Sequence, residues 1–370
     1  LGAVPIRRRM DHGDGPVDNS GTFDALYQVL RTGGCMGIFP EGISHTHSEL
    51  SKLKTGAARI ALGAYEDHED HAPIYVVPVG LTYLHRQRFR SQVLVHFGDP
   101  IVIDDEWRAA HKEDDQQAVR ELTDEIDQSL RSLTINAPDW DTMRFLHAVR
   151  RIYKPSGVHL SLEDYAELMR RFTEGYERVK EMPDIQQTRS EVEQYQTLLR
   201  ELQLQDHDLR KKYHIGNALS RILKRVLYLV ILLPMAIPGF VLHSPIMVSA
   251  FVAGDRLTAR KDVVATTKLV VSILLVPMLY LALTSVIVWF SNIFIGVAIL
   301  MCLPLTGFAT VRVLEQQFSI GKSVGSLWRL IRFQNEVDKI QQLRKELEEK
   351  IHHAVDQYHD KSIPRMFPKA

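Results

Sequence analysis

The sequence predicts an α/β domain, a helical extension and a membrane-embedded helical region, in that order along the chain. Short apolar runs alternate with helical patterns first, charged sequence with helical periodicity follows, and two long stretches free of charged residues come next. A chain of 370 residues with 45% hydrophobic content buries a sizeable core and has room for more than one domain.

The predicted α/β domain spans residues 1–103. Its expected helices are Thr22–Leu30 and Gly56–Tyr65, and its expected strands are the apolar runs Cys35–Phe39, Tyr75–Val79 and Val93–Phe97. Continuous apolar runs of this length are typical of a sheet that is largely buried. Pro78 has no N–H for a strand ladder, so we expect it at a sheet edge or a strand end.

Two charged regions of the sequence predict helices outside this domain. Residues 104–225 are poor in proline and helically periodic, which predicts the helical extension. Residues 312–370 contain a second charged helix, Asn335–Lys361, which we expect in the cytosol. Its apolar residues recur every three or four positions, a pattern that predicts a packing seam.

Residues 226–311 form the predicted membrane region. The run 226–253 has no charged residue but contains three prolines, so it fits either one kinked span or a re-entrant hairpin that turns near Pro238-Gly239. The run 269–311 has the length of a helical hairpin with a turn near Ser291-Asn292. A buried core helix is the alternative for both runs.

Basic residues lie on every flank of the two apolar runs: Arg221, Lys224 and Arg225 before the first, Arg256, Arg260, Lys261 and Lys268 between them, and Arg312 and Lys322 after the second. The positive-inside rule then places all three flanks in the cytosol. This arrangement favours a re-entrant first run and a second run that crosses the membrane twice.

Composition excludes several classes of function. The formal net charge is zero, so no overall positive field would attract nucleic acid, and we expect no nucleic-acid partner. We interpret Cys35 and Cys302 as small hydrophobic residues rather than a disulfide pair. The histidines lack partners at the spacing of metal ligands, so we expect no metal site and no cofactor.

The most informative motif is Phe39-Pro40-Glu41-Gly42-Ile43-Ser44-His45, which begins at the end of the expected strand Cys35–Phe39 and precedes Lys54-Thr55-Gly56. Gly42 permits an unusual backbone angle, so Glu41 is presented where a strand is expected to end. Its carboxylate can accept hydrogen bonds from hydroxyl groups, and Ser44 offers a second polar contact. Lys54 places a cation beside a predicted helix N-terminus, a favourable place for phosphate, although a plain surface lysine is the alternative.

These residues resemble the third sequence block of the glycerolipid acyltransferases, and within them the fungal-type glycerol-3-phosphate/dihydroxyacetone-phosphate acyltransferases. Gly2–Arg8 is similar to the second block of that family, and Val76–Gly80 to the fourth. The resemblance implies an acyltransferase α/β domain in which Arg8 and Lys54 hold the acceptor's phosphate and Glu41, Gly42 and Ser44 bind the acceptor. It also implies an acyl or acceptor pocket lined by Phe39, Pro40, Val77, Pro78 and Val79.

The family's catalytic pair is His-x4-Asp, with histidine as the general base. The resemblance places this pair upstream of Leu1, so the chain looks truncated and we assign no catalytic residue within it. His159 and Asp164 have the same spacing, but they lie far downstream, and Ser161 between them is typical of a helix N-cap. We therefore reject that match.

The resemblance implies a membrane-bound enzyme that transfers a fatty acyl group from acyl-CoA, or from acyl carrier protein, to glycerol 3-phosphate or dihydroxyacetone phosphate. Two alternatives stay open: acylation of 1-acylglycerol 3-phosphate, and a catalytically incomplete membrane scaffold. The expected partners are the two substrates and the lipid bilayer. The expected location is the endoplasmic reticulum membrane, with the catalytic domain in the cytosol.

Overall fold

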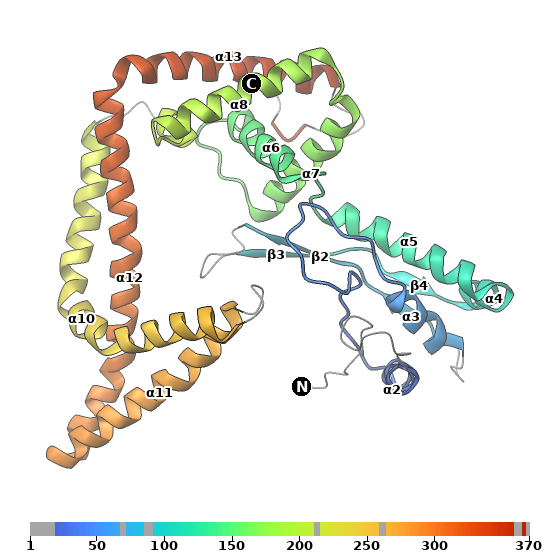
Figure 1. The fold of residues 1–370 in the computed structure, drawn as a ribbon, viewed down its shortest axis with the longest axis horizontal. Helices are drawn as coiled ribbons and strands as arrows, with labels where there is room; N and C mark the ends of the chain where they lie inside the picture. The colour runs from blue at the N-terminus through green and yellow to red at the C-terminus, as the bar shows by residue number, and fades with distance from the viewer. Residues whose placement is uncertain are drawn as a thin grey trace. The chain divides into compact units, whose positions relative to one another are not determined.

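The computed structural model describes residues 19–66, 72–84, 92–210, 215–258, 264–358 and 365–367. The chain consists of two compact units (Figure 1). Unit 1 comprises Leu1–Gln196 and Arg344–Ala370, and unit 2 comprises Thr197–Leu343. Helices dominate both units. The described strands form only two antiparallel pairs.

The first part of unit 1 contains all of the described strands. Its elements are α2 (Ser20–Arg31), α3 (Gly56–Glu66), β1 (Ile74–Val76), β2 (Val79–Tyr83), β3 (Val93–Phe97), β4 (Ile101–Ile103), α4 (Asp105–Glu113) and α5 (Asp115–Leu133). β1 pairs with β4, with Tyr75 opposite Val102, and β2 pairs with β3, with Leu81 opposite Val95. Pro78 lies between β1 and β2, at a strand end, as its missing N–H predicts.

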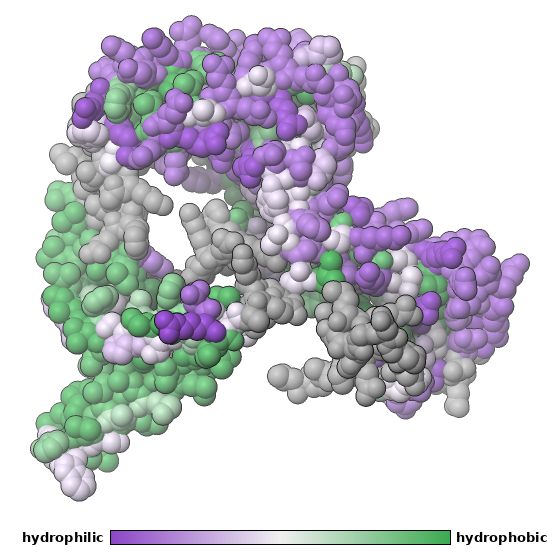
Figure 2. Space-filling view, in the orientation of Figure 1, coloured by the Kyte–Doolittle hydropathy of each residue, from purple (hydrophilic) through white to green (hydrophobic). Residues whose placement is uncertain are grey.

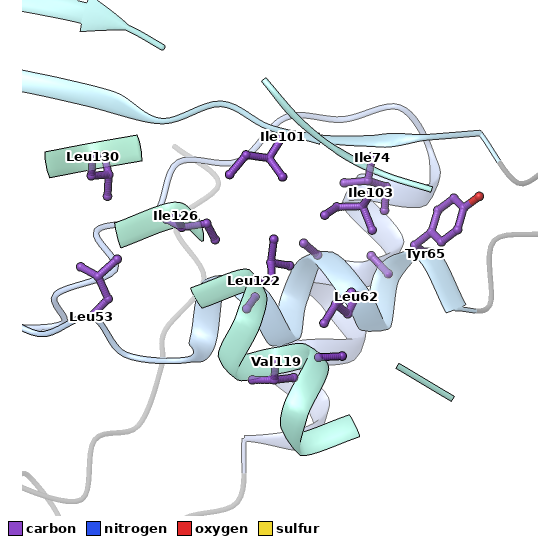
Figure 3. Packing of buried hydrophobic residues seen from close by; sticks show 14 residues of the cluster. Leu53, Leu62, Tyr65, Ile74, Ile101, Ile103, Val119, Leu122, Ile126 and Leu130 are labelled. Carbon is purple, nitrogen blue, oxygen red and sulfur yellow. The ribbon is translucent and has the colours of Figure 1, made fainter. Parts of the chain in front are cut away.

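A hydrophobic core joins α3 and α5 to the β1–β4 pair (Figure 3). Leu62 of α3, Ile103 of β4 and Leu122 of α5 are almost completely buried in it. α3 is rich in alanine, which lets its neighbours approach closely. The α/β domain expected from the sequence ends at residue 103. A domain boundary there would divide this core, because α4 and α5 pack against the strands that precede them.

The expected strand Cys35–Phe39 is absent from the described structure, and this prediction was wrong. An apolar segment becomes a β-strand only when the backbone of another strand lies beside it and exchanges hydrogen bonds with it. Residues 35–39 instead form an extended segment in which Phe39 is 80% exposed. The expectation of a largely buried sheet also fails for the β2–β3 pair, because Tyr83 and Phe97 are more than half exposed.

The remaining helices of unit 1 pack against one another. They are α6 (Trp140–Tyr153), α7 (Leu162–Val179), α8 (Pro183–Glu201) and the last part of α13 (Gln334–Tyr358). Asp139 caps α6, and Ser161 and Asp164 form a capping box on α7. α13 is anchored by Lys350, whose Nζ lies 2.6 Å from both carboxylate oxygens of Glu191 on α8. Ile340, Leu347 and Ile351 of the expected seam are buried.

Unit 2 consists of α9 (Asp206–Arg210), α10 (Ile215–Arg256), α11 (Val264–Phe290), α12 (Ile293–Arg332) and the first part of α13. Among the described residues, three helical segments are long and apolar enough to cross a membrane: Leu223–Arg256, Val264–Phe290 and Ile293–Gln316. Hydrophobic residues cover the visible faces of these helices (Figure 2). The break between α11 and α12 falls at Ser291 and Asn292, and the Asn292 side chain caps α12.

α10 is one helix with a sharp bend, which is visible in Figure 1. Before the bend it packs on α12, where Ala236, Ala309 and Val313 form a buried cluster. After the bend it runs beside α11, since Gly254 lies against the Lys268 side chain. Pro238 interrupts the helical hydrogen-bond ladder close to the bend, as prolines do in kinked helices.

A polar junction joins the three helices near this bend. His243 on α10 bonds the Gly239 carbonyl through Nδ1 (2.7 Å) and the Tyr280 hydroxyl of α11 through Nε2 (2.9 Å). The Thr310 hydroxyl of α12 donates to the Ala236 carbonyl (3.1 Å). In an apolar environment each of these polar groups would be costly without a partner, so the junction stabilises the bend.

Gly239→Ala is expected to destabilise unit 2. A Cβ at this position would lie 2.3 Å from the Thr306 backbone oxygen, and backbone cannot move aside as a side chain can. Overpacking of this kind costs roughly 1–3 kcal/mol. Gly254→Ala is the matched control, because its new Cβ meets only the flexible Lys268 side chain. Thermal unfolding in lipid nanodiscs, followed by circular dichroism, should show a lower midpoint for Gly239→Ala alone.

His147→Phe is expected to remove part of the acid sensitivity of unit 1. Burial, together with the nearby Arg150 and Arg151, lowers the pKa of His147 to about 4. The unfolded chain would bind this proton near pH 6.5, so the native state loses stability as the pH falls from about 6.5 towards 4, by at most about 3 kcal/mol. The melting temperature of the wild-type chain should therefore fall more steeply across this window than that of the variant. Equal slopes would contradict the assignment.

Candidate functional site

The loop that carries the Phe-Pro-Glu-Gly motif is closed on itself by backbone hydrogen bonds. The Gly42 N–H donates to the Phe39 carbonyl (3.1 Å), and the Lys54 N–H donates to the Pro40 carbonyl (2.7 Å). Gly42 has a φ of +67°, and a Cβ there would lie 3.2 Å from Cγ of Lys54. Glycine therefore suits both the positive φ of the turn and the close approach of the Lys54 side chain. The loop brings Glu41, Gly42 and Lys54 together across twelve residues of sequence.

The Glu41 carboxylate is held by two donors from further along the loop. Its Oε2 accepts the Ser51 backbone N–H (2.9 Å) and a short hydrogen bond from Nε2 of His45. Both side chains are largely withdrawn from solvent, with 25% of Glu41 and 15% of His45 exposed. One oxygen of Glu41 is thus fixed in place, while Oε1 makes no hydrogen bond to the described residues.

The hydrogen bonds of His45 define its role. The His47 backbone N–H donates to Nδ1 of His45 (3.1 Å), so in the neutral ring the proton is on Nε2 and points to Glu41. The Ser51 hydroxyl lies 2.9 Å from the same Nε2. A catalytic relay uses opposite ring nitrogens for the carboxylate and the hydroxyl. This cluster therefore positions Glu41 and does not form a Ser-His-acid relay.

The loop is anchored to residues nearly ninety positions away. The Asn136 side chain accepts the Leu50 N–H (2.9 Å), and Arg131 donates to the Leu50 carbonyl (3.2 Å). Nε1 of Trp140 donates to the Thr46 carbonyl (2.6 Å). Leu53, just before Lys54, is buried in the core of α3 and α5. The end of α5 and the start of α6 therefore fix the shape of the loop.

The predicted binding residues have different surroundings. Lys54 is exposed one residue before the turn that opens α3, and the first turn of α3 has no acidic residue to compete for an anion. Ser44 is exposed, and Ser51, which sequence reasoning missed, makes the contact with Glu41 instead. Nothing in the sequence marks Ser51, because a partner ten positions away within a loop follows no periodic pattern.

The predicted pocket residues lie on two segments. Phe39 is 80% exposed and Pro40 is half-buried beside the turn, whereas Pro78 is buried between β1 and β2 with Val77 and Val79 on either side. Arg8 lies outside the described residues. The rejected His159–Asp164 match is explained by the fold, because the Asp164 carboxylate accepts the hydroxyl of Ser161 (2.7 Å) in the cap of α7.

Comparison with known proteins gives the same family over both units. The family model described as "Glycerol-3-phosphate acyltransferase 2 C-terminal domain" matches residues 145–363, and the model described as "Acyltransferase" matches residues 1–82. No solved structure matches the chain.

Three curated relatives cover most of the chain. It is 34% identical to glycerol-3-phosphate O-acyltransferase 2 and 33% identical to glycerol-3-phosphate O-acyltransferase 1 of Saccharomyces cerevisiae, over 71% and 72% of its length. An uncharacterized acyltransferase of Schizosaccharomyces pombe is 31% identical over 71% of the chain. The matched regions span 37%, 37% and 41% of these relatives. The chain belongs to the glycerol-3-phosphate acyltransferase family.

Proposed function

We propose that this chain provides the acceptor-binding and membrane-anchoring parts of an O-acyltransferase. The enzyme would transfer a fatty acyl group from acyl-CoA to a hydroxyl of glycerol 3-phosphate or dihydroxyacetone phosphate. The observation that carries the proposal is the closed loop, which fixes the Glu41 carboxylate and brings the backbone of Lys54 to that of Pro40, in a chain of this family.

The loop suits a small acceptor that carries both hydroxyl and phosphate groups. Oε1 of Glu41 would accept a hydrogen bond from an acceptor hydroxyl, because Oε2 is already occupied by the loop. Lys54, together with Arg8, would neutralise the phosphate, helped by the N-terminus of α3. Phe39, Val77 and Val79 would contact the acyl chain. These contacts orient the acceptor hydroxyl for attack on the thioester.

Acylation of 1-acylglycerol 3-phosphate is the second candidate, since that acceptor presents a hydroxyl and a phosphate to the same loop. A catalytically incomplete scaffold is the third. Membranes that contain the protein should be assayed with radiolabelled glycerol 3-phosphate, dihydroxyacetone phosphate and 1-acylglycerol 3-phosphate, each with acyl-CoA. Transfer only to the last acceptor would select the second candidate, and no transfer at all would select the scaffold.

For the membrane region we propose that all three basic flanks lie in the cytosol, at the endoplasmic reticulum. α11 and α12 would cross as a hairpin, and the bent α10 would enter and leave on the cytosolic side. Its three prolines and the polar junction support a bend inside the membrane. A single cysteine placed at Leu257 should react with an impermeant thiol reagent from the cytosolic side of sealed vesicles, and one placed at Ser291 only from the lumenal side. Lumenal labelling at position 257 would overturn this topology.

Lys54→Ala and Arg8→Ala are expected to raise the apparent KM for the phosphorylated acceptor by roughly tenfold or more, because each removes a charge-assisted contact to phosphate. The KM for acyl-CoA should change much less. Initial rates with each substrate varied in turn give both constants. Equal effects on the two substrates would contradict the phosphate assignment.

Glu41→Gln is expected to lower kcat/KM more for glycerol 3-phosphate than for dihydroxyacetone phosphate. Glycerol 3-phosphate offers two hydroxyl donors to a carboxylate, whereas dihydroxyacetone phosphate offers one hydroxyl and a carbonyl, which cannot donate. The comparison uses competing acceptors in a single reaction. Equal losses for both would show that Glu41 does not bind the second hydroxyl.

His45→Ala should lower kcat/KM by roughly tenfold, because Glu41 would lose a partner that fixes its carboxylate. Thr46→Ala is the matched control from the neighbouring position, where the side chain is exposed. Its activity should stay close to that of the wild type. Equal losses in the two variants would contradict the positioning role of His45.

A further inference from the structure

Unit 1 contains an apolar cavity that neither the acceptor loop nor the membrane helices use. It lies among α6, α7, α8 and the end of α13, and its volume is about 180 Å³. Aliphatic and aromatic side chains dominate its walls, among them Phe145, Leu146, Val149, Phe172, Ile185 and Val355. The cavity opens to the surface, where Glu174 and Arg178 of its lining are exposed.

Because the cavity opens to the surface, its apolar walls face water when it is empty, and a hydrocarbon guest would remove them from water. For scale, an enclosed apolar cavity on the order of 150 Å³ takes up a benzene-sized guest. The volume in unit 1 therefore corresponds to a short stretch of hydrocarbon.

Several polar groups in the cavity walls have partners within the protein. The Thr188 hydroxyl donates to the Asp184 carbonyl (2.8 Å), and the Tyr358 hydroxyl donates to the Asp184 carboxylate (3.0 Å). Arg189 donates to the Tyr176 hydroxyl (2.6 Å). Few directional contacts therefore remain for a polar guest inside the cavity, and an aliphatic chain fits these walls better.

Gly175 also leaves room for a guest. It lies within α7, where glycine costs up to about 1 kcal/mol relative to alanine. Its φ is not positive, and a Cβ there would find no atom within 4 Å. Neither backbone conformation nor close packing explains the glycine, but it lines the cavity, and its missing side chain keeps that wall open.

Two arginines of α7, Arg171 and Arg178, also line the cavity. Arg171 is paired with Glu167 (2.6 Å). Arg178 is exposed and makes no hydrogen bond or ion pair with the residues that the structure describes. Glu174 is the acidic residue of the lining, and Arg170 binds its carboxylate (2.6 Å). An anionic group at the mouth would thus meet Arg178.

We propose that this cavity binds one acyl chain of a single-chain anionic lipid of the fatty-acid type. The hydrocarbon would lie against Phe145, Phe172 and Gly175, and the headgroup would pair with Arg178. The three membrane-capable helices would hold the chain where such lipids are abundant. This inference concerns binding alone and does not depend on the proposed acyl transfer.

The test uses the full chain in phosphatidylcholine nanodiscs and a palmitate that carries a photoreactive diazirine near the end of its chain. After irradiation, mass spectrometry identifies the labelled peptides. Labelling of α6, α7, α8 or α13 is expected, and labelled α11 peptides serve as the internal reference for probe dissolved in the lipid. Labelling confined to the membrane helices would overturn the proposal.

Gly175→Leu and Thr188→Leu should each fill the cavity from a different helix and reduce its labelling by about tenfold relative to α11. Both replace a poorer helix former with leucine, so folding should be retained, and the melting temperature checks this. If both variants fold and are labelled as strongly as the wild type, the site is not this cavity.

Arg178→Glu should reduce the labelling by about tenfold through charge repulsion, while Arg120→Glu, an exposed arginine of α5 outside the cavity, should not. Excess lysophosphatidylcholine, which has the same chain and a zwitterionic headgroup, should compete poorly with the probe. Equal labelling of the two arginine variants, or equal competition by the zwitterionic lipid, would overturn the anionic assignment.

Discussion

The hydrogen bond from the Lys54 N–H to the Pro40 carbonyl is the interaction on which the candidate site depends. Taken alone, a bond of this kind contributes about 1 kcal/mol. Its effect is larger here because Leu53, the preceding residue, is buried between α3 and α5. Packing in the core holds Leu53 in place, and Leu53 in turn positions the neighbouring Lys54. The hydrogen bond of the Lys54 N–H then closes the loop, with the Lys54 side chain against Gly42. A change in the core would therefore reach the site through Leu53 and through the contact of Arg131 on α5 with Leu50.

The sequence predicted most of the helices because their signals are local. The expected helix Gly56–Tyr65 agrees with α3 to within one residue, and β3 has the expected bounds. The capping role of Ser161 was likewise predicted from the residues around it. These features depend on side-chain periodicity and on neighbours three or four positions away, which a single sequence shows directly.

The contacts that hold the candidate site are not local, and the sequence did not reveal them. Asn136 and Trp140 contact the loop from 86 and 94 residues away, and no spacing rule connects them to it. The motif itself identified Glu41, but not Ser51 or the orientation of His45. The run Cys35–Phe39 was overpredicted as a strand because apolar composition says nothing about whether a partner strand lies alongside.

The membrane helices show how a lipid environment restricts polar side chains. His243 is the only histidine in the apolar run 226–253, which contains no Asp, Glu, Lys or Arg, and both of its ring nitrogens are hydrogen-bonded. A histidine in that environment needs two partners, and those partners need glycine at 239 and 307 to let the helices approach. The bend lets α10 pack against α12 through Ala236 and Gly239 and against α11 through His243 and Gly254. The bend, the two glycines and His243 therefore depend on one another. A substitution at any of these residues would disturb the contacts of the others.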